Sequence, residues 1–199
     1  MNLKELAPGI LLFENVMQDT EIFISELEES ANIGLVQWND ASQSNGSYNS
    51  KNVIEKKIRN CKVISIPPYD VMSEDRKIGA LYEIHKTLNS ILNPYFNEYC
   101  KLLNAHHWKQ NEGWQLLKYG SDNYFINHYD DSKLFNRTIS MSFFLNDNYE
   151  GGEIEFTRFG LNIKPKANQA VFFPSNYAYS HSVNIVTSGT RYSIVGWWE

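Results

Sequence analysis

Two histidines and one aspartate in the C-terminal half of the chain have the types and the spacing to hold a metal ion. His128 and Asp130 are separated by one residue, so in an extended strand both side chains point to one face and Tyr129 points to the other. His181 lies in a second strand-like run, residues 178–186, which a sheet could place beside the first. Two imidazoles and one carboxylate on one side of a metal leave the opposite coordination positions open, as at non-haem Fe(II) sites.

The same residues also have simpler interpretations. A His-x-Asp pair is weak support by itself in a chain with five histidines, because it arises readily by chance. Asp130 and Asp131 would then form an acidic loop that pairs with Lys133 or Arg137, and His181 would be a buried, hydrogen-bonded histidine. The metal hypothesis therefore depends on what accompanies these residues.

Arg191 follows His181 across the turn signal of residues 187–190. We expect a hairpin that places a metal ligand on one strand and a guanidinium on the next, with both able to point into the same interior. An arginine offers a bidentate fork to a carboxylate and keeps its charge when buried. A dicarboxylic keto acid has one end that chelates iron and a distal carboxylate for such an arginine, and the spacing suits 2-oxoglutarate. Arg191 alone could form a structural ion pair, but the four residues together favour an iron and keto-acid site.

The chain is expected to fold as one domain of residues 1–199. Its hydrophobic content of 42% and aromatic content of 14% are typical of a globular protein. A net charge of −5 argues against a general nucleic-acid or anionic-membrane surface. The N-terminus lacks an apolar signal segment, no run reaches membrane-spanning length, and Cys61 and Cys100 read as reduced, buried thiols. We therefore expect a cytoplasmic protein without a membrane partner, whose oligomeric state the sequence leaves open.

The first part of the chain, residues 1–105, is expected to supply helical support. An apolar run at residues 9–17 predicts a buried strand. Apolar residues at helical spacing predict a helix over residues 20–32, which Asp19 or Thr20 could cap.

The sequence then alternates between polar and apolar stretches. Residues 38–57 are rich in Asn, Ser, Gln, Gly and Lys, which predicts a long polar loop or a frayed hairpin. We expect a mobile segment, either a lid over the site or a disordered loop. A strand is predicted over residues 61–66, followed by a long helix over about residues 73–103 that Pro94 should kink or divide. His85, within this helix, is interpreted as a packing or surface residue and not as a metal ligand.

Beyond residue 110 the apolar residues no longer recur at helical spacing but at every second position, the period of a strand. Turn signals separate eight short runs at near-regular spacing, which favours a double-sheet roll or barrel with the helices outside it. The predicted fold is mainly β with flanking α-helices around a double-stranded β-helix (jelly-roll) core at about residues 114–198. The strand candidates are residues 114–118, 124–129, 138–145, 153–157, 161–164, 169–173, 178–186 and 191–198.

Several motifs in this order make the chain resemble the prolyl 4-hydroxylase branch of the Fe(II)/2-oxoglutarate-dependent oxygenases, which includes collagen-type and oxygen-sensing prolyl hydroxylases. The resemblance covers about residues 114–198 and, more loosely, the N-terminal helices. The motifs are Tyr119-Gly with Tyr124 and His128-Tyr-Asp130, Arg137-Thr-Ile-Ser-Met-Ser-Phe-Phe-Leu-Asn146, Glu150-Gly-Gly-Glu, Val171-Phe-Phe-Pro174, His181-Ser-Val, and Gly189-Thr-Arg-Tyr-Ser-Ile-Val-Gly-Trp197.

The resemblance implies a role for each matching residue. His128, Asp130 and His181 would be the iron ligands, and Arg191 would bind the distal carboxylate of 2-oxoglutarate with help from Tyr119. Two departures concern that carboxylate, because the branch has a second tyrosine and a threonine where this chain has Phe144 and Val195. Ser193, on the same strand face as Arg191 by period-two counting, could substitute for them.

The resemblance also implies residues for the substrate side. Arg137 matches a basic residue near the substrate entrance of the oxygen-sensing branch. Tyr129, Tyr124 and Trp197 are assigned to the same side, although Tyr124 and Trp197 could equally be plain core aromatics.

The implied function is a 2-oxoglutarate-dependent dioxygenase that uses Fe(II) and O2, with ascorbate as reductant. For this branch the reaction is 4-hydroxylation of prolyl residues in a peptide or protein, with succinate and CO2 as co-products. Two alternatives remain: the same site could act on a free amino acid, another side chain or an alkylated base, or the roll could be a non-catalytic binding module.

Overall fold

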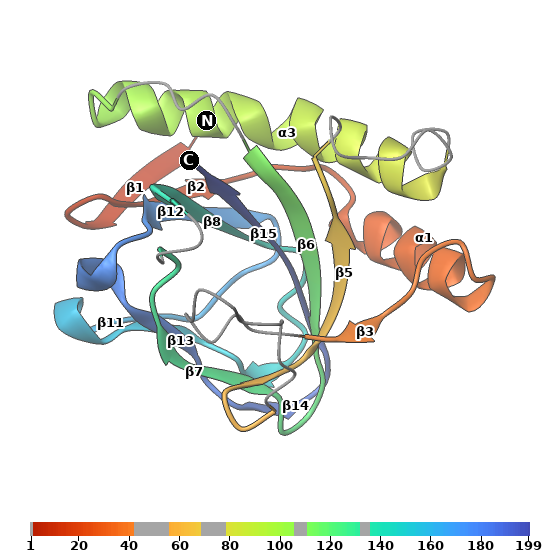
Figure 1. Cartoon of the computed structure of the whole chain (residues 1–199). Coiled ribbons are helices and arrows are strands. Elements are labelled where there is room, and N and C mark those ends of the chain that lie inside the picture. The colour runs from red at the N-terminus through yellow and green to blue at the C-terminus, as the bar shows by residue number, and fades with distance from the viewer. Residues whose placement is uncertain (1, 42–55, 69–78, 106–110, 132–135) are drawn as a thin grey trace.

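The computed structural model describes residues 2–41, 56–68, 79–105, 111–131 and 136–199 (Figure 1). Within these ranges the α-helices are α1 (Thr20–Asn32) and α3 (Ala80–Leu102). Two short 3-10 helices, η2 (Thr157–Phe159) and η3 (Tyr177–Tyr179), lie among the later strands. The strands are β1 (Asn2–Ala7), β2 (Ile10–Glu14), β3 (Asn39–Asp40), β4 (Arg59–Asn60), β5 (Lys62–Ile66), β6 (Asn111–Tyr119), β7 (Tyr124–His128), β8 (Ile139–Phe144), β9 (Glu150–Gly151), β10 (Ile154–Phe156), β11 (Leu161–Ile163), β12 (Gln169–Pro174), β13 (His181–Val183), β14 (Val186–Ser188) and β15 (Arg191–Trp198).

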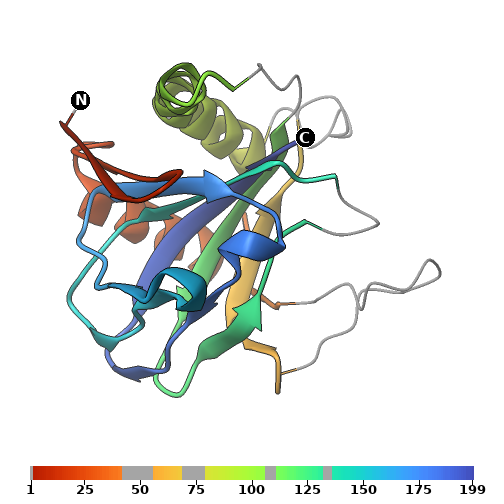
Figure 2. The same cartoon turned by 90° about the vertical axis from the view of Figure 1, so that its left-hand side faces the viewer.

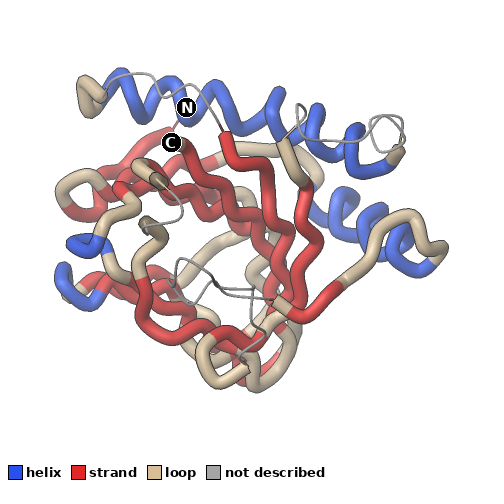
Figure 3. The backbone as a smooth tube through the Cα atoms, in the orientation of Figure 1, coloured by secondary structure: helices blue, strands red, loops and turns tan. Residues whose placement is uncertain are grey.

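Two antiparallel sheets face each other and form a roll. The larger has eight strands in the order β1-β2-β12-β8-β15-β6-β5-β3, and the smaller has five in the order β11-β10-β13-β7-β4. Strands β14 and β9 form a short ribbon of their own. Figure 3 shows the strands surrounding the interior of the roll, with both α-helices outside it. The predicted double-stranded β-helix with flanking helices is confirmed.

The helices cover the outer face of the eight-stranded sheet. The predicted apolar stripe of α3 is buried there, with Leu88 and Leu92 fully enclosed. Phe96 stacks on Trp198 of β15 with 4.2 Å between ring centroids. Figure 2 shows α3 nearly end-on, lying against this sheet. Successive residues of a strand point to opposite faces of the sheet. In the large sheet, one set of side chains therefore contacts the helices, and the residues adjacent to them in sequence point into the roll.

A second apolar cluster fills the space between the two sheets. It combines residues of the large sheet, such as Leu117 and Phe144, with Ile154, Phe156 and Val183 of the small sheet. The two clusters bury both faces of the central strands of the large sheet, which explains why β12 reads as a nearly continuous apolar run.

The observed elements correct several details of the predictions. The helix over residues 20–32 is confirmed, but Asp19 at its N-cap has left-handed backbone and no side-chain capping bond. Helix α3 is one continuous helix with Pro94 inside it, so the expected division is wrong. The run 178–186 is not one strand, because η3, β13 and the start of β14 share it. Most of the polar stretch 38–57 lies outside the described residues.

The N-terminal part is more than helical support. Strands β1 and β2 extend the large sheet at one edge, and β5 and β3 extend it at the other. No described helix is long and apolar enough to cross a membrane.

We expect the contact between α3 and the sheet to contribute strongly to stability. Leu92→Ala removes a fully buried side chain and should lower the free energy of unfolding by about 2–5 kcal/mol, measured by urea denaturation. The same change at Leu102, which is 46% exposed at the end of the helix, is the matched control and should have a much smaller effect. Equal losses in the two variants would contradict this account.

Candidate active site

A cavity of about 500 Å³ opens between the two sheets. Its size lies within the range of small-molecule sites. Both sheets contribute to its walls. The residues that line it include Arg59, Glu112, Gln115, Tyr119, Phe125, His128, Tyr129, Asp130, Arg137, His181, Arg191, Ser193 and Trp197.

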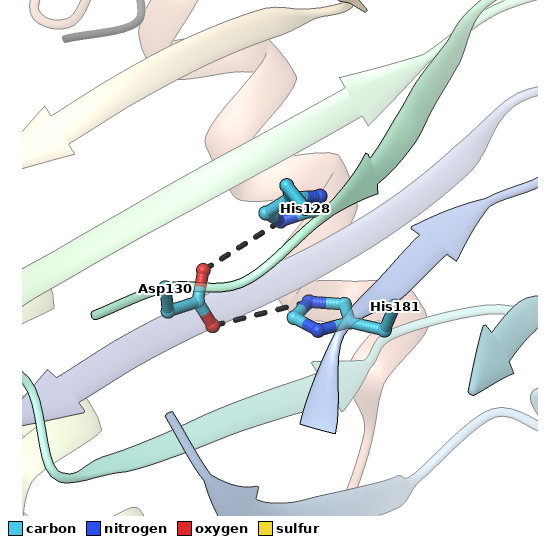
Figure 4. Close-up of side chains that lie close together, drawn as sticks. All are labelled: His128, Asp130 and His181. Atoms are coloured by element: carbon cyan, nitrogen blue, oxygen red, sulfur yellow. Dashed lines mark ion pairs between the residues drawn. The ribbon is translucent and has the colours of Figure 1, made fainter. Parts of the chain in front are cut away.

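His128, Asp130 and His181 converge at this cavity (Figure 4). His128 Nε2 lies 3.6 Å from Asp130 Oδ1, and His181 Nε2 lies 3.8 Å from Asp130 Oδ2. One ligand atom from each residue lies within 4.8 Å of the other two, so the three can hold a single metal ion. The histidines are brought together by the pairing of β7 with β13, in which His128 and His181 are direct cross-strand partners.

Asp130 reaches the site from beyond the strand and not from within it. Strand β7 ends at His128, so the expected extension through residue 129 is one residue too long. The backbone N–H groups of Asp130 and Asp131 both donate to the Ser175 carbonyl oxygen, at 3.1 and 3.0 Å. Ser140 Oγ donates to Asp130 Oδ2 at 2.6 Å and is itself 2.8 Å from Ser175 Oγ. These bonds fix the direction of the carboxylate.

The backbone also fixes the tautomer of both histidines. His128 Nδ1 is 2.9 Å from the Ile126 carbonyl oxygen, and His181 Nδ1 is 3.1 Å from that of Tyr179. A carbonyl oxygen only accepts, so each Nδ1 carries a proton, and each Nε2 is the ring nitrogen directed toward Asp130. Such outer bonds orient metal-binding histidines.

The electrostatics of the site keep its residues in their metal-binding forms. Burial opposes a charge on Asp130, but His181, His128 and the bond from Ser140 outweigh it, so the pKa of Asp130 lies well below its ordinary value. Burial, together with the nearby His128, lowers the pKa of His181 to about 4. At neutral pH the aspartate is anionic and His181 is neutral, which are the forms that bind metals. The donor set fits Fe(II) of the 2-His-1-carboxylate type.

Arg191 lies in the same cavity but on the other sheet. His181 belongs to β13 of the small sheet and Arg191 to β15 of the large one, so the simple hairpin expected from residues 181–191 is wrong. The ribbon strand β14 lies between them in the chain, and the two side chains face the cavity from opposite walls. Arg191 is 1% exposed, and its Nη1 donates to Ser193 Oγ at 2.9 Å, which places Ser193 on the expected face.

Two aromatic rings flank the Arg191 guanidinium. Its Cζ lies 5.2 Å from the ring centroid of Tyr119 and 5.4 Å from that of Phe144. Burial raises the pKa of Tyr119, so this side chain is a neutral phenol. No carboxylate among the described residues pairs with Arg191, and its Nε has no hydrogen-bond partner.

Tyr149 is a neighbour of Arg191 that the sequence did not indicate. A Cβ added to Gly152 would come within 2.9 Å of both Arg191 Cδ and Tyr149 Cε2, so the missing side chain at residue 152 leaves room for both. The Tyr149 hydroxyl is buried and has no hydrogen-bond partner within the described part of the chain. Burial raises the pKa of Tyr149, and the positive charge of Arg191 partly offsets this increase.

The residues predicted for the substrate side lie at different places around the cavity. Trp197 lines the cavity, with the Arg137 guanidinium 3.9 Å above its ring centroid. Arg137 Nε and Nη2 donate to the Glu112 carboxylate, with a shortest distance of 2.7 Å. This pairing with Glu112 was not foreseen. Tyr129 is 52% exposed and lies at the rim of the cavity.

The expected place of Tyr124 is wrong. Its side chain does not line the cavity, and its hydroxyl donates to the Lys57 carbonyl oxygen. Phe125 lines the cavity instead and stacks on the His128 ring at 3.5 Å. The pairing of β7 with β13 shifts register between residues 125 and 128, so β7 has one extra residue there. Such a bulge reverses the face on which the preceding residues point.

Comparisons with known proteins agree with this site. Residues 114–199 match the family model described as the 2OG-Fe(II) oxygenase superfamily. A PKHD-type hydroxylase of Psychrobacter sp. (strain PRwf-1) is 40% identical in an alignment of 80 residues that covers 38% of this chain. The matched segment spans only 30% of the length of that curated relative.

Solved structures of prolyl hydroxylases have the same fold. A Trichoplax adhaerens prolyl hydroxylase, in complex with a hypoxia inducible factor peptide fragment, superposes with a TM-score of 0.73 at 18% identity over 96% of this chain and 83% of its own. A viral collagen prolyl hydroxylase from Paramecium Bursaria Chlorella virus-1 gives 0.64 at 18% identity, over 95% and 94% of the two chains. The resemblance to Fe(II)/2-oxoglutarate oxygenases drawn from the sequence is confirmed.

We expect the Ser140 hydroxyl to matter for metal affinity although it does not contact the metal. Ser140→Ala leaves Asp130 without its shortest hydrogen bond and should weaken metal binding by roughly 10- to 100-fold, measured by Mn(II) titration against a chelator. Ser188→Ala, an exposed strand position, is the control. Wild-type affinity in Ser140→Ala would show that the carboxylate is oriented without it.

Proposed function

We propose that the protein is an Fe(II)- and 2-oxoglutarate-dependent dioxygenase that hydroxylates prolyl residues in a peptide or protein. The observation that carries the proposal is the convergence of His128, Asp130 and His181 on a cavity whose opposite wall holds the buried Arg191. One wall can bind a metal and the other a distal carboxylate, which is the arrangement that a chelating keto acid requires. We also propose that residues 1–199 act as one domain, because N-terminal strands complete the large sheet.

Different residues of the cavity would bind the metal and the co-substrate. The two Nε2 atoms and the Asp130 carboxylate hold Fe(II), which, when bound, supplies the redox chemistry with O2 and 2-oxoglutarate that yields succinate and CO2. Arg191, held by Ser193, would bind the distal carboxylate of 2-oxoglutarate, and Tyr119, which lines the same cavity, would hydrogen-bond the co-substrate.

Aromatic side chains would keep water away from the metal ligands. Phe125 stacks on His128, while Phe156 and Phe173 pack around His181 with centroid distances of 5.4 and 4.8 Å. A dry site strengthens the electrostatic interactions within it and protects reactive species from side reactions.

A prolyl substrate is supported by the structural neighbours and by the rim of the cavity. The neighbours named above are prolyl hydroxylases, and one is bound to a peptide. In our proposal Trp197, Tyr129 and the paired Arg137 offer aromatic and polar surface on which a peptide would lie.

The metal centre can be tested with a nearly isosteric change. Asp130→Asn removes the anionic ligand and should abolish tight Fe(II) binding and the formation of succinate from 2-oxoglutarate in the presence of ascorbate. Asp122→Asn is the matched control, because residue 122 is exposed and asparagine tolerates its φ of 64°. A wild-type protein that binds neither Fe(II) nor 2-oxoglutarate would contradict the proposed function.

Tyr149 offers a test of how the distal carboxylate is held in the absence of a tyrosine at residue 144. We propose that its hydroxyl accepts a hydrogen bond from Arg191 Nε–H when the guanidinium turns toward the co-substrate. Tyr149→Phe should then raise the KM for 2-oxoglutarate by up to about tenfold with little change in kcat. Tyr177→Phe, at a residue that is 67% exposed, is the control, and an unchanged KM in Tyr149→Phe would remove this role.

A further inference from the structure

Arg59 is a second buried guanidinium in the cavity, and the site described so far does not use it. It lies on β4, the edge strand of the small sheet, directly opposite Phe125 of β7. Its side chain lines the cavity, and the residue is only 8% exposed. Its Cζ lies 5.0 Å from the ring centroid of Phe125, the ring that stacks on His128. One aromatic side chain therefore contacts both Arg59 and a proposed iron ligand.

The position of Arg59 is fixed from across the roll. Its Nη2 donates to Gln115 Oε1 of β6 at 3.1 Å, which joins the edge of the small sheet to the large sheet. Because the amide oxygen faces the guanidinium, the NH2 end of Gln115 is a further donor in the same part of the cavity. Arginine and amide together offer several N–H groups that an oxygen anion can accept from.

The part of the chain that the structure describes offers Arg59 no negatively charged partner. No carboxylate among the described residues forms an ion pair with it, and its Nε has no hydrogen-bond partner. Its neighbours are the Gln115 amide, the Phe125 ring, the Tyr119 phenol and the free thiol of Cys61. A guanidinium stays protonated in proteins, and a buried charge is costly unless it is paired.

Binding of Fe(II) and 2-oxoglutarate would not neutralise the positive charge of Arg59. Fe(II) and the 2-oxoglutarate dianion cancel each other, and the charge of Arg191 is matched by that of Asp130. Arg137 is already paired with Glu112. Among the described residues of the cavity, one buried positive charge therefore remains beside the metal ligands when Fe(II) and 2-oxoglutarate are both bound.

We propose that Arg59 and Gln115 form a subsite for a carboxylate on the substrate, close to the carbon that is oxidised. This inference rests on the iron and 2-oxoglutarate site of the proposed function. It replaces an internal prolyl residue as substrate by a proline that carries a free carboxylate, either at the C-terminus of a peptide or as the free amino acid. An internal prolyl residue has a neutral amide at that place and leaves the guanidinium without a counter-ion. A free amino acid or the C-terminal residue of a peptide carries the carboxylate that completes the pair.

The test compares probes that differ only in this carboxylate. L-proline is paired with L-prolinamide, and the tripeptide Ala-Gly-Pro with its C-terminal amide. Their binding to the full chain loaded with Mn(II) and 2-oxoglutarate is measured by calorimetry. We expect the acid to bind on the order of tenfold or more tightly than the amide in at least one pair, because hydrogen bonds to charged groups are worth that much. A preference for the acid in the proline pair indicates a free amino acid as substrate, and a preference in the tripeptide pair indicates the C-terminal residue of a peptide.

The variants assign the preference to Arg59. Arg59→Gln should reduce the ratio of the two affinities to near one, and Arg59→Lys should keep part of it. Arg158→Gln removes a positive charge outside the cavity and should keep the wild-type ratio. Succinate formation with the same probes provides a second measurement, in which the acid should stimulate turnover more than the amide.

Several outcomes would overturn the proposal. They are equal binding within both pairs, no binding by any probe, and a preference that survives in Arg59→Gln. A loss of 2-oxoglutarate affinity in Arg59→Gln with an unchanged preference would assign the guanidinium to the co-substrate. If the wild-type chain binds Mn(II) and 2-oxoglutarate but shows no preference, only the subsite fails; if it binds neither, the proposed function fails as well.

Discussion

The site depends on the antiparallel pairing of β7 with β13, which sets His128 opposite His181. Everything else about the metal-binding group follows from that register. A slip by one residue would turn one imidazole to the other face of the sheet and remove the group altogether. The bulge in β7 maintains this pairing while placing Phe125 beneath His128. Ser140 and Ser175, from β8 and the end of β12, then hold Asp130 where the two Nε2 atoms point.

The two-sheet architecture separates the binding functions. The metal-binding residues belong to the small sheet and the segment that follows β7, whereas Arg191 and Ser193 belong to β15 of the large sheet. The distance between these walls is set by the apolar cluster between the sheets, and the large sheet is held in shape by α1 and α3 on its outer face. A close-packed interior has little freedom to deform, so distant side chains such as Leu92 contribute to the geometry of the cavity.

Buried charge distinguishes this cavity from an ordinary apolar pocket. Arg59 and Arg191 both lie within it with less than a tenth of their surface exposed, and neither has a carboxylate partner among the described residues. Proteins rarely leave such groups unpaired unless a ligand completes them. The two guanidinium groups are the places where we propose that anions bind: Arg191 at the start of β15, and Arg59 on the edge strand β4.

The sequence by itself determined the fold class and the class of oxygenases that the chain resembles. His128, Asp130, His181 and Arg191 were identified from residue types and spacing, and the change of hydrophobic period separated helices from strands, because both signals are local in the chain. Only the tertiary structure decided which residues meet. It put His181 and Arg191 on different sheets, replaced Tyr124 by Phe125, and brought Arg59, Glu112 and Tyr149 to the site. These outcomes depend on strand register, on a bulge and on contacts across the roll. Such features produce no recognisable pattern of residue types along the sequence.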